Sequence, residues 1–203
     1  MVKQISVFFG IAFLIAACET KTSEPEIEVH VEHGEFTDSR DGQTYKTVTI
    51  ESQTWMAENL NYKTDKSFCY NNVTDSCNIY GRLYSEYRFN NDYIELCPEG
   101  WHTPNREEWI ILFETVGGTE TAGIKLHSSD RWMYSWDIGE NKYGFSILPA
   151  GEKCSNFNGI NEWATFWVRD NSTIYNQVNI SGKYPYFENT DYDCAFSIRC
   201  IKD

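Results

Sequence analysis

Seven cysteines constrain the fold of this 203-residue chain more than any other feature. Cys18 closes an N-terminal apolar run, and six more follow at Cys69, Cys77, Cys97, Cys154, Cys194 and Cys200. An even number of cysteines in an exported chain indicates disulfides, although six allow fifteen connectivities and their spacing does not choose among them. No Cys-x-x-Cys pair occurs, which argues against a zinc site.

The start of the chain indicates export. Lys3 precedes an apolar run over residues 5–17, which is shorter than the ~20 residues that a membrane-spanning helix needs but long enough for a signal peptide. The run ends in the letters LIAAC, which resemble the lipobox of bacterial lipoproteins. We therefore expect residues 1–17 to be a signal peptide and Cys18 to carry lipid, which anchors the protein in the cell envelope, at the outer membrane.

The segment after Cys18 is polar and acidic. It contains Pro25 and shows no sustained apolar period, so we expect residues 18–40 to form an acidic tether that lifts a single domain, residues 41–203, off the bilayer. His30 and His33 lie in this segment without further ligands nearby. They are expected to be solvated and not bound to metal.

The charge balance excludes some partners. Without residues 1–17, which contain one lysine, 16 basic residues stand against 30 acidic ones, a formal charge of −14. This balance argues against nucleic acid and is compatible with neutral polysaccharide, calcium or simple solubility. Glu188, Asp191 and Asp193 could hold calcium in a loop, but surface acidity is the expected reason for them, and we expect no cofactor.

Residue patterns predict an α+β domain with short elements. Residues 43–58 favour a β-hairpin that turns near Ser52. A helix is expected to begin after Asn105, which can form a capping box with Glu108, and to end at the Gly117-Gly118 pair. Further helices are expected over residues 81–89 and 121–126, and strands within residues 143–148, 162–169, 174–180 and 195–201.

Six motifs in order carry a resemblance to a known family. They are QTWMAENLNY from Gln53, CYNN from Cys69, YGRLY from Tyr80, CPEGWHTP from Cys97, GFSILPAG from Gly144 and the closing IRCIKD from Ile198. Together they resemble the Fibrobacter succinogenes major paralogous domain family, from about Asp41 to the C-terminus. The chain departs from the family pattern in residues 90–95, before Cys97.

The resemblance implies a C-type-lectin-like fold with short helices, small antiparallel sheets, long loops and disulfides. It suggests the pairings Cys69–Cys77, Cys97–Cys200 and Cys154–Cys194. Many members are exported lipoproteins without an assigned activity, so the family implies fold and location more than function.

Two aromatic clusters are the candidate ligand contacts. Trp132, Tyr134 and Trp136 alternate at the period of a strand, so they share one face that either stacks on sugar rings or packs inward. A second cluster lies near Pro185 and consists of Tyr184, Tyr186 and Phe187. The Glu-Pro-Asn and Trp-Asn-Asp elements through which C-type lectins bind sugar by calcium are absent from the sequence.

The expected function is therefore binding or adhesion, with a glycan or an envelope protein as the partner, and not catalysis. One alternative is a copper oxidase similar to formylglycine-generating enzymes, in which Cys194 and Cys200 would hold the metal. Another is a structural envelope component. Trp101 and Trp109 are expected in the core, and His102 and His127 are expected to form structural hydrogen bonds.

Overall fold

The computed structural model describes residues 28–85, 88–89, 92–93, 95–169, 177–189 and 193–203. The predicted signal peptide and the lipidation site at Cys18 lie outside the described residues. Within the described part of the chain, no helix is long and apolar enough to cross a membrane.

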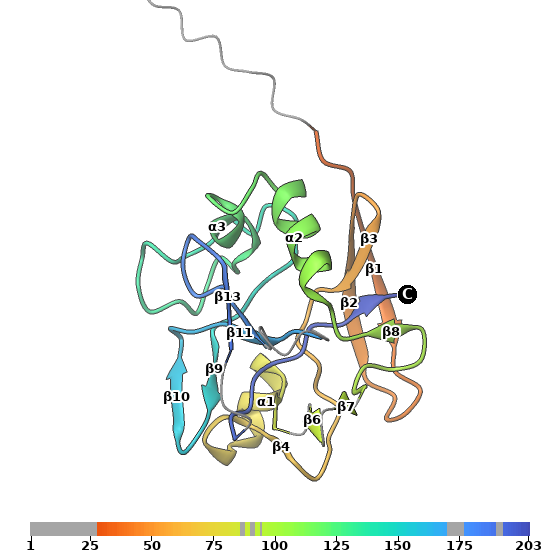
Figure 1. Ribbon diagram of the computed structural model, residues 1–203, viewed down its shortest axis with the longest axis vertical. Coiled ribbons are helices and arrows are strands. Elements are labelled where there is room, and N and C mark those ends of the chain that lie inside the picture. The colour runs from red at the N-terminus through yellow and green to blue at the C-terminus, as the bar shows by residue number, and fades with distance from the viewer. Residues whose placement is uncertain (1–27, 86–87, 90–91, 94, 170–176, 190–192) are drawn as a thin grey trace, which may run out of the picture.

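The largest element is a five-stranded antiparallel sheet that joins the two ends of the described chain (Figure 1). The predicted hairpin is confirmed, because its two strands pair in register from Thr47–Met56 to Ile50–Gln53. The last strand lies between the hairpin and a short edge strand. In spatial order the strands are β1 (Val31–Thr37), β2 (Thr44–Ile50), β3 (Gln53–Met56), β14 (Ile201–Lys202) and β8 (Trp101–His102).

Strand β1 corrects the predicted boundary of the tether. Residues 31–37 were expected to belong to it, but they pair with all of β2, from Val31–Ile50 to Thr37–Thr44. This edge strand is held by main-chain hydrogen bonds and keeps most of its side chains in solvent, which explains why it has no apolar pattern. The turn that follows is fixed by Asp38, whose buried carboxylate accepts hydrogen bonds from the Arg40 guanidinium.

Helix α2 (Arg106–Thr115) packs its apolar side against this sheet. The predicted capping box is present, since the Asn105 side chain accepts from the Glu108 amide at 2.9 Å and the Glu108 carboxylate accepts from the Asn105 amide at 2.7 Å. Trp109 is fully buried, and its ring centroid lies 4.8 Å from that of Trp55 in β3. The predictions of this helix and of Trp109 as a core residue are confirmed.

The other helices are short. They are η1 (Tyr70–Asn72), α1 (Thr74–Tyr80) and α3 (Ala122–Leu126), the last of which lies within its predicted range. The helix expected over residues 81–89 is wrong. Gly81, at a φ of 74°, ends α1, and a β-carbon there would lie 2.9 Å from the Leu60 carbonyl oxygen, so the chain leaves the helix and enters a strand.

Four smaller antiparallel sheets complete the α+β fold. Residues 143–148, predicted as a strand, form only an isolated bridge between Ile147 and His127. Residues 195–201 form bridges before β14, and the segment 174–176 lies outside the described residues. The paired strands are β4 (Ser67–Phe68) with β5 (Leu83–Tyr84), β6 (Arg88–Phe89) with β7 (Asp92–Tyr93), β9 (Ala150–Lys153) with β10 (Phe157–Ile160), and β12 (Gln177–Asn179) between β11 (Thr165–Trp167) and β13 (Tyr186–Glu188).

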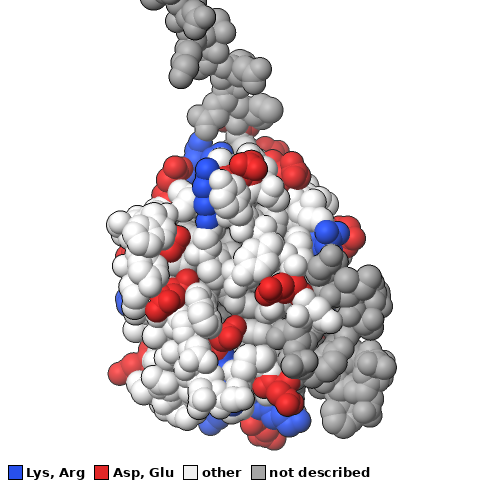
Figure 2. Space-filling view, turned by 60° about the vertical axis from the view of Figure 1, so that its left-hand side comes forward, with Lys and Arg blue, Asp and Glu red and all other residues white. Residues whose placement is uncertain are grey.

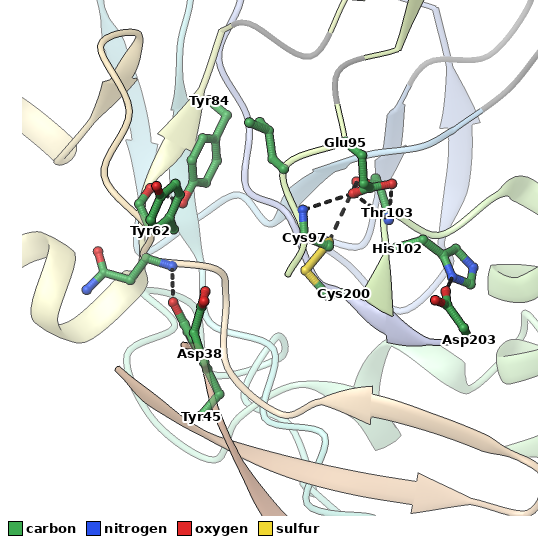
Figure 3. The surroundings of a disulfide bond; sticks show 12 residues. Asp38, Tyr45, Tyr62, Tyr84, Glu95, Cys97, His102, Thr103, Cys200 and Asp203 are labelled. Carbon is green, nitrogen blue, oxygen red and sulfur yellow. Dashed lines mark hydrogen bonds and ion pairs between the residues drawn. A yellow bond between two sulfur atoms is a disulfide. The ribbon is translucent and has the colours of Figure 1, made fainter. Parts of the chain in front are cut away.

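Three disulfides join these parts, and their pairings are those that the family resemblance implies. Cys69–Cys77 closes a local loop, Cys97–Cys200 links residues 103 apart in sequence, and Cys154–Cys194 links residues 40 apart. Figure 3 shows that Glu95 lies beside the long bridge, where its carboxylate accepts hydrogen bonds from the Cys97 and Thr103 amides. The long bridge therefore fastens the segment before α2 to the last strand.

Candidate functional site

The first predicted aromatic cluster does not form a strand, so its three rings do not share a face. Trp132 is 6% exposed and stacks on the His127 ring with a centroid separation of 3.9 Å. It is therefore a core residue and not a ligand contact. The alternation rule fails here because residues 128–141 form a loop with turns, in which side-chain direction does not follow a period of two.

Tyr134 and Trp136 do face solvent, and their rings lie against each other. The Asp137 amide donates to the Tyr134 carbonyl at 3.0 Å, which closes a turn between them. The two ring centroids are 4.9 Å apart and the ring planes differ by 9°. Trp136 is 70% exposed, more than any other large apolar side chain in the described part of the chain.

The second predicted cluster comes to the same place. Tyr184 and Tyr186 line one hollow of about 350 Å³ together with Tyr134 and Trp136, although the two pairs are separated by almost fifty residues. Phe187 points the other way and packs against Phe113 of α2, 6.3 Å between centroids. We call this site the aromatic hollow and define it by its five rings, Tyr134, Trp136, Trp163, Tyr184 and Tyr186.

Sequence reasoning missed Trp163. This residue follows the β10 strand, and its position is set by Gly159, whose φ of 72° and missing side chain leave room for the indole. A β-carbon on Gly159 would lie 2.3 Å from the Trp163 ring. Trp163 lies in the segment 162–169 that was predicted as a strand, but a strand pattern does not indicate which of its rings faces solvent. The local signal for its position is Gly159, four residues earlier in the sequence.

Helix α3 supports the far side of the hollow. The Gly123 amide donates to the Lys183 carbonyl at 3.2 Å, and a β-carbon on Gly123 would lie 2.0 Å from the Gly182 carbonyl oxygen. The helix backbone therefore lies directly against the 182–183 turn that carries Tyr184. Figure 2 turns the side of α3, β10 and β13 towards the viewer, and most of this face is uncharged, with acidic side chains scattered over it.

Polar groups surround the rings. Asp137, Glu162, Asn179, Ser181 and Lys183 line the hollow. The Lys183 ammonium lies 5.1 Å from the centroid of the Tyr184 ring, and the Ser181 hydroxyl oxygen accepts from the Ala164 amide, which leaves its hydrogen free to donate. Burial raises the pKa of Asp137 and of Tyr186. The arrangement offers stacking surfaces with donors and acceptors at their edges.

A second, larger cleft of about 520 Å³ lies between the β2–β3 hairpin, α1 and residues 128–131. It carries Lys46, Glu58, Asp130 and Arg131, and no aromatic side chain lines it. Among the described residues, the buried side-chain oxygen of Asn61 in this cleft has no hydrogen-bond partner. No sequence pattern indicates this cleft, because its polar residues come from separate loops.

The other candidate chemistry is not assembled. Cys194 and Cys200, the pair expected to hold copper in an oxidase, are bonded to Cys154 and Cys97 instead. Within the described ranges, no group of three histidine, cysteine or acidic residues could hold a metal ion, and Asp191 of the calcium candidates lies outside them.

The two histidines that were expected to be structural do form hydrogen bonds. His102 lies 2.6 Å from a carboxylate oxygen of Asp203, as Figure 3 shows. Its other ring nitrogen lies 2.8 Å from the carboxylate of Glu108. His127 is fully buried behind the aromatic hollow.

The fold and this site define an α+β domain that is cross-linked by disulfides and has an exposed aromatic surface. Residues 48–202 match the model of the Fibrobacter succinogenes major domain, and the chain belongs to this family. The match begins within β2, so β1 precedes it. Neither a comparison with curated proteins nor one with solved structures finds a match.

Proposed function

We propose that this protein is a lipid-anchored protein of the cell envelope, at the outer membrane, whose domain binds neutral glycans through the aromatic hollow. The observation that carries the proposal is the convergence of five exposed rings, from three separate segments, on one hollow. Large exposed apolar patches are uncommon on monomeric soluble proteins and usually mark binding surfaces. Five of the ten large exposed apolar side chains in the described residues line this hollow, and two more, Met133 and Ile138, belong to the same loop as Tyr134 and Trp136.

The chemistry of the hollow favours a sugar. A pyranose ring has one face of C–H groups and an edge of hydroxyls, which match an indole or phenol ring bordered by carboxylate, amide and hydroxyl groups. The ligand is expected to be neutral, because Asp137 and Glu162 at the rim and the formal charge of −14 after residue 17 repel acidic polysaccharides. β-Linked pyranoses are preferred, since their chains present flat faces to stacked rings.

The test is binding of cellohexaose, chitohexaose and mannohexaose to the full-length protein in detergent, measured by calorimetry. The variant Trp136→Ala removes the most exposed ring and is expected to weaken binding about tenfold, since an aromatic contact contributes about 0.5–1.5 kcal/mol beyond the area it buries. The matched control is Ile111→Ala. Ile111 is 50% exposed on α2 and does not line the hollow, so this change should leave affinity unaltered.

A protein partner is the competing outcome. If none of the three hexasaccharides binds, while the wild type retains envelope proteins that Trp136→Ala does not, the hollow is a protein-binding surface and the glycan proposal is wrong. If Trp136→Ala and Ile111→Ala bind a hexasaccharide equally well, the sugar site lies elsewhere.

The lipid anchor at Cys18 and the C-type-lectin-like fold are part of the same proposal. The lipobox-like letters before Cys18 support lipid attachment, and mass spectrometry of the N-terminal peptide should find an acylated Cys18. The C-type-lectin-like assignment is supported by the joining of both ends of the described chain in one sheet and by the Cys97–Cys200 bridge. A Cys18→Ser variant that stays with the membrane fraction would contradict the lipid anchor.

A further inference from the structure

His127 connects the two halves of the aromatic hollow from behind. One half is the loop with Tyr134 and Trp136, and the other follows strand β12 and carries Tyr184 and Tyr186. The His127 Nδ1 atom lies 2.8 Å from the backbone carbonyl of Asp137, in the first half. Its Nε2 atom lies 2.5 Å from the backbone carbonyl of Ile180, at the start of the second half.

Both partners of the imidazole are carbonyl oxygens, which only accept hydrogen bonds. A neutral imidazole has one N–H group and can donate to one of them, whereas an imidazolium has two and can donate to both. In the neutral form one ring nitrogen therefore presents its lone pair to a carbonyl oxygen. The contact to one half of the hollow is then repulsive, whichever tautomer is present.

The remaining surroundings of His127 leave little room for another arrangement. Trp132 covers one face of the ring at 3.9 Å between centroids, and a β-carbon on Gly139 would lie 2.3 Å from the carbonyl oxygen of His127. Among the described residues, Asp137 is the charged residue that acts on the imidazole, and the further contacts of the imidazole ring are the Asp137 and Ile180 carbonyls and the Trp132 ring. Burial lowers the pKa of His127, so the neutral form predominates at neutral pH.

We propose that His127 is a positioning residue for the glycan site, and that gain of its second ring proton on acidification holds both halves of the hollow in the arrangement that binds sugar. This inference rests on the proposed function. A ligand that spans both halves binds the protonated form more tightly, and by linkage the bound ligand makes His127 easier to protonate. Glycan affinity therefore rises as the pH falls.

The test follows His127 directly by NMR of the imidazole C–H groups while the full-length protein is titrated between pH 8 and 4. The titration is run without sugar and with the hexasaccharide that binds most tightly among cellohexaose, chitohexaose and mannohexaose. The chain has four histidines, so His30, His33 and His102 serve as internal references. We expect the sugar to raise the midpoint pH of the His127 titration and to leave those of the other three histidines unchanged. The affinity for the sugar should rise about fivefold or more as the pH falls through this midpoint, which is the lower end of common coupling factors.

Two variants separate His127 from its charged neighbour. Asp137→Asn removes the carboxylate but keeps the backbone carbonyl, so the pH dependence of affinity should persist. His127→Phe keeps a ring against Trp132 and removes both ring nitrogens, so its affinity should be weak and independent of pH. If the His127→Phe variant does not fold, the titration of the wild type still decides whether sugar binding is coupled to protonation of His127.

The outcomes distinguish the two proposals. A hexasaccharide that binds without moving the His127 midpoint overturns the role of His127 and leaves the glycan function standing. Loss of the pH dependence in Asp137→Asn assigns the effect to the carboxylate and also overturns it. Absence of binding at every pH removes the proposed function together with this inference.

Discussion

At the scale of single residues, glycines and one buried histidine determine where the exposed rings lie. Gly159 and Gly123 bring backbone or rings closer than any side chain would permit, and each supports one side of the aromatic hollow. The shape of the aromatic hollow therefore depends on positions that carry no functional group.

Substitution of Gly159 by alanine tests this dependence. The change is expected to destabilise the fold by about 1–2 kcal/mol, because φ is positive there, and also to displace Trp163 and weaken glycan binding. Gly42 is the matched control: it also has a positive φ of 77°, but a β-carbon there would meet nothing within 4 Å. Gly42→Ala should cost only the stability lost to the positive φ, measured by urea unfolding, without any effect on binding. Equal loss of binding in both variants would contradict the role given to Gly159.

The buried imidazole also predicts how stability depends on pH. The ordinary pKa of histidine is 6.5, and burial lowers the pKa of His127 in the folded protein, so the unfolded chain binds more protons below pH 6.5. The free energy of unfolding should therefore fall as the pH drops from 6.5 to the pKa that His127 has in the folded protein. Below that pKa the imidazole is protonated in both states, so His127 lowers the stability no further. His127→Phe should lack this component in denaturant titrations at several pH values, and an unchanged slope would argue against it.

At the scale of elements, the helix and hairpin that depend on neighbouring residues were predicted correctly, whereas features that depend on contacts between distant residues were not. The capping box at Asn105 and the β2–β3 hairpin are encoded within a few residues, and both were found from sequence. The helix expected from residue 81 failed because Gly81 lies against the Leu60 carbonyl, a contact across twenty residues. The aromatic hollow was predicted as two separate clusters, since nothing in either segment indicates that they meet, and β1 was hidden by its exposed side chains.

The N-cap of α2 is the element whose contribution is simplest to measure. Asn105→Ala should lower the free energy of unfolding by about 1 kcal/mol, because the Glu108 amide loses its acceptor at 2.9 Å. Asn105→Ser supplies a hydroxyl oxygen as the acceptor and should restore most of that loss. Unfolding in urea gives both values, and a serine variant as unstable as the alanine variant would mean that the side chain acts in some other way.

At the scale of the whole molecule, the disulfides differ in how much of the chain they restrict. On the chain-entropy account, closing a loop near 100 residues, as Cys97–Cys200 does, contributes about 4.7 kcal/mol, against about 2.5 kcal/mol for the local Cys69–Cys77 loop. The double variant Cys97→Ser/Cys200→Ser should therefore lower the melting temperature more than Cys69→Ser/Cys77→Ser. Calorimetry compares the two, and the reverse order would show that local strain or packing outweighs loop length.

The place of β14 in the main sheet has a consequence for the timing of folding. This strand is made from residues 201–202, yet it lies between β3 and β8, so these two parts of the sheet cannot join before the chain has been made as far as residue 202. Cys200 likewise can pair with Cys97 only once the whole segment between them has been made. A sheet that is joined through so distant a strand forms slowly, and closure of the Cys97–Cys200 bridge accompanies the step that completes it.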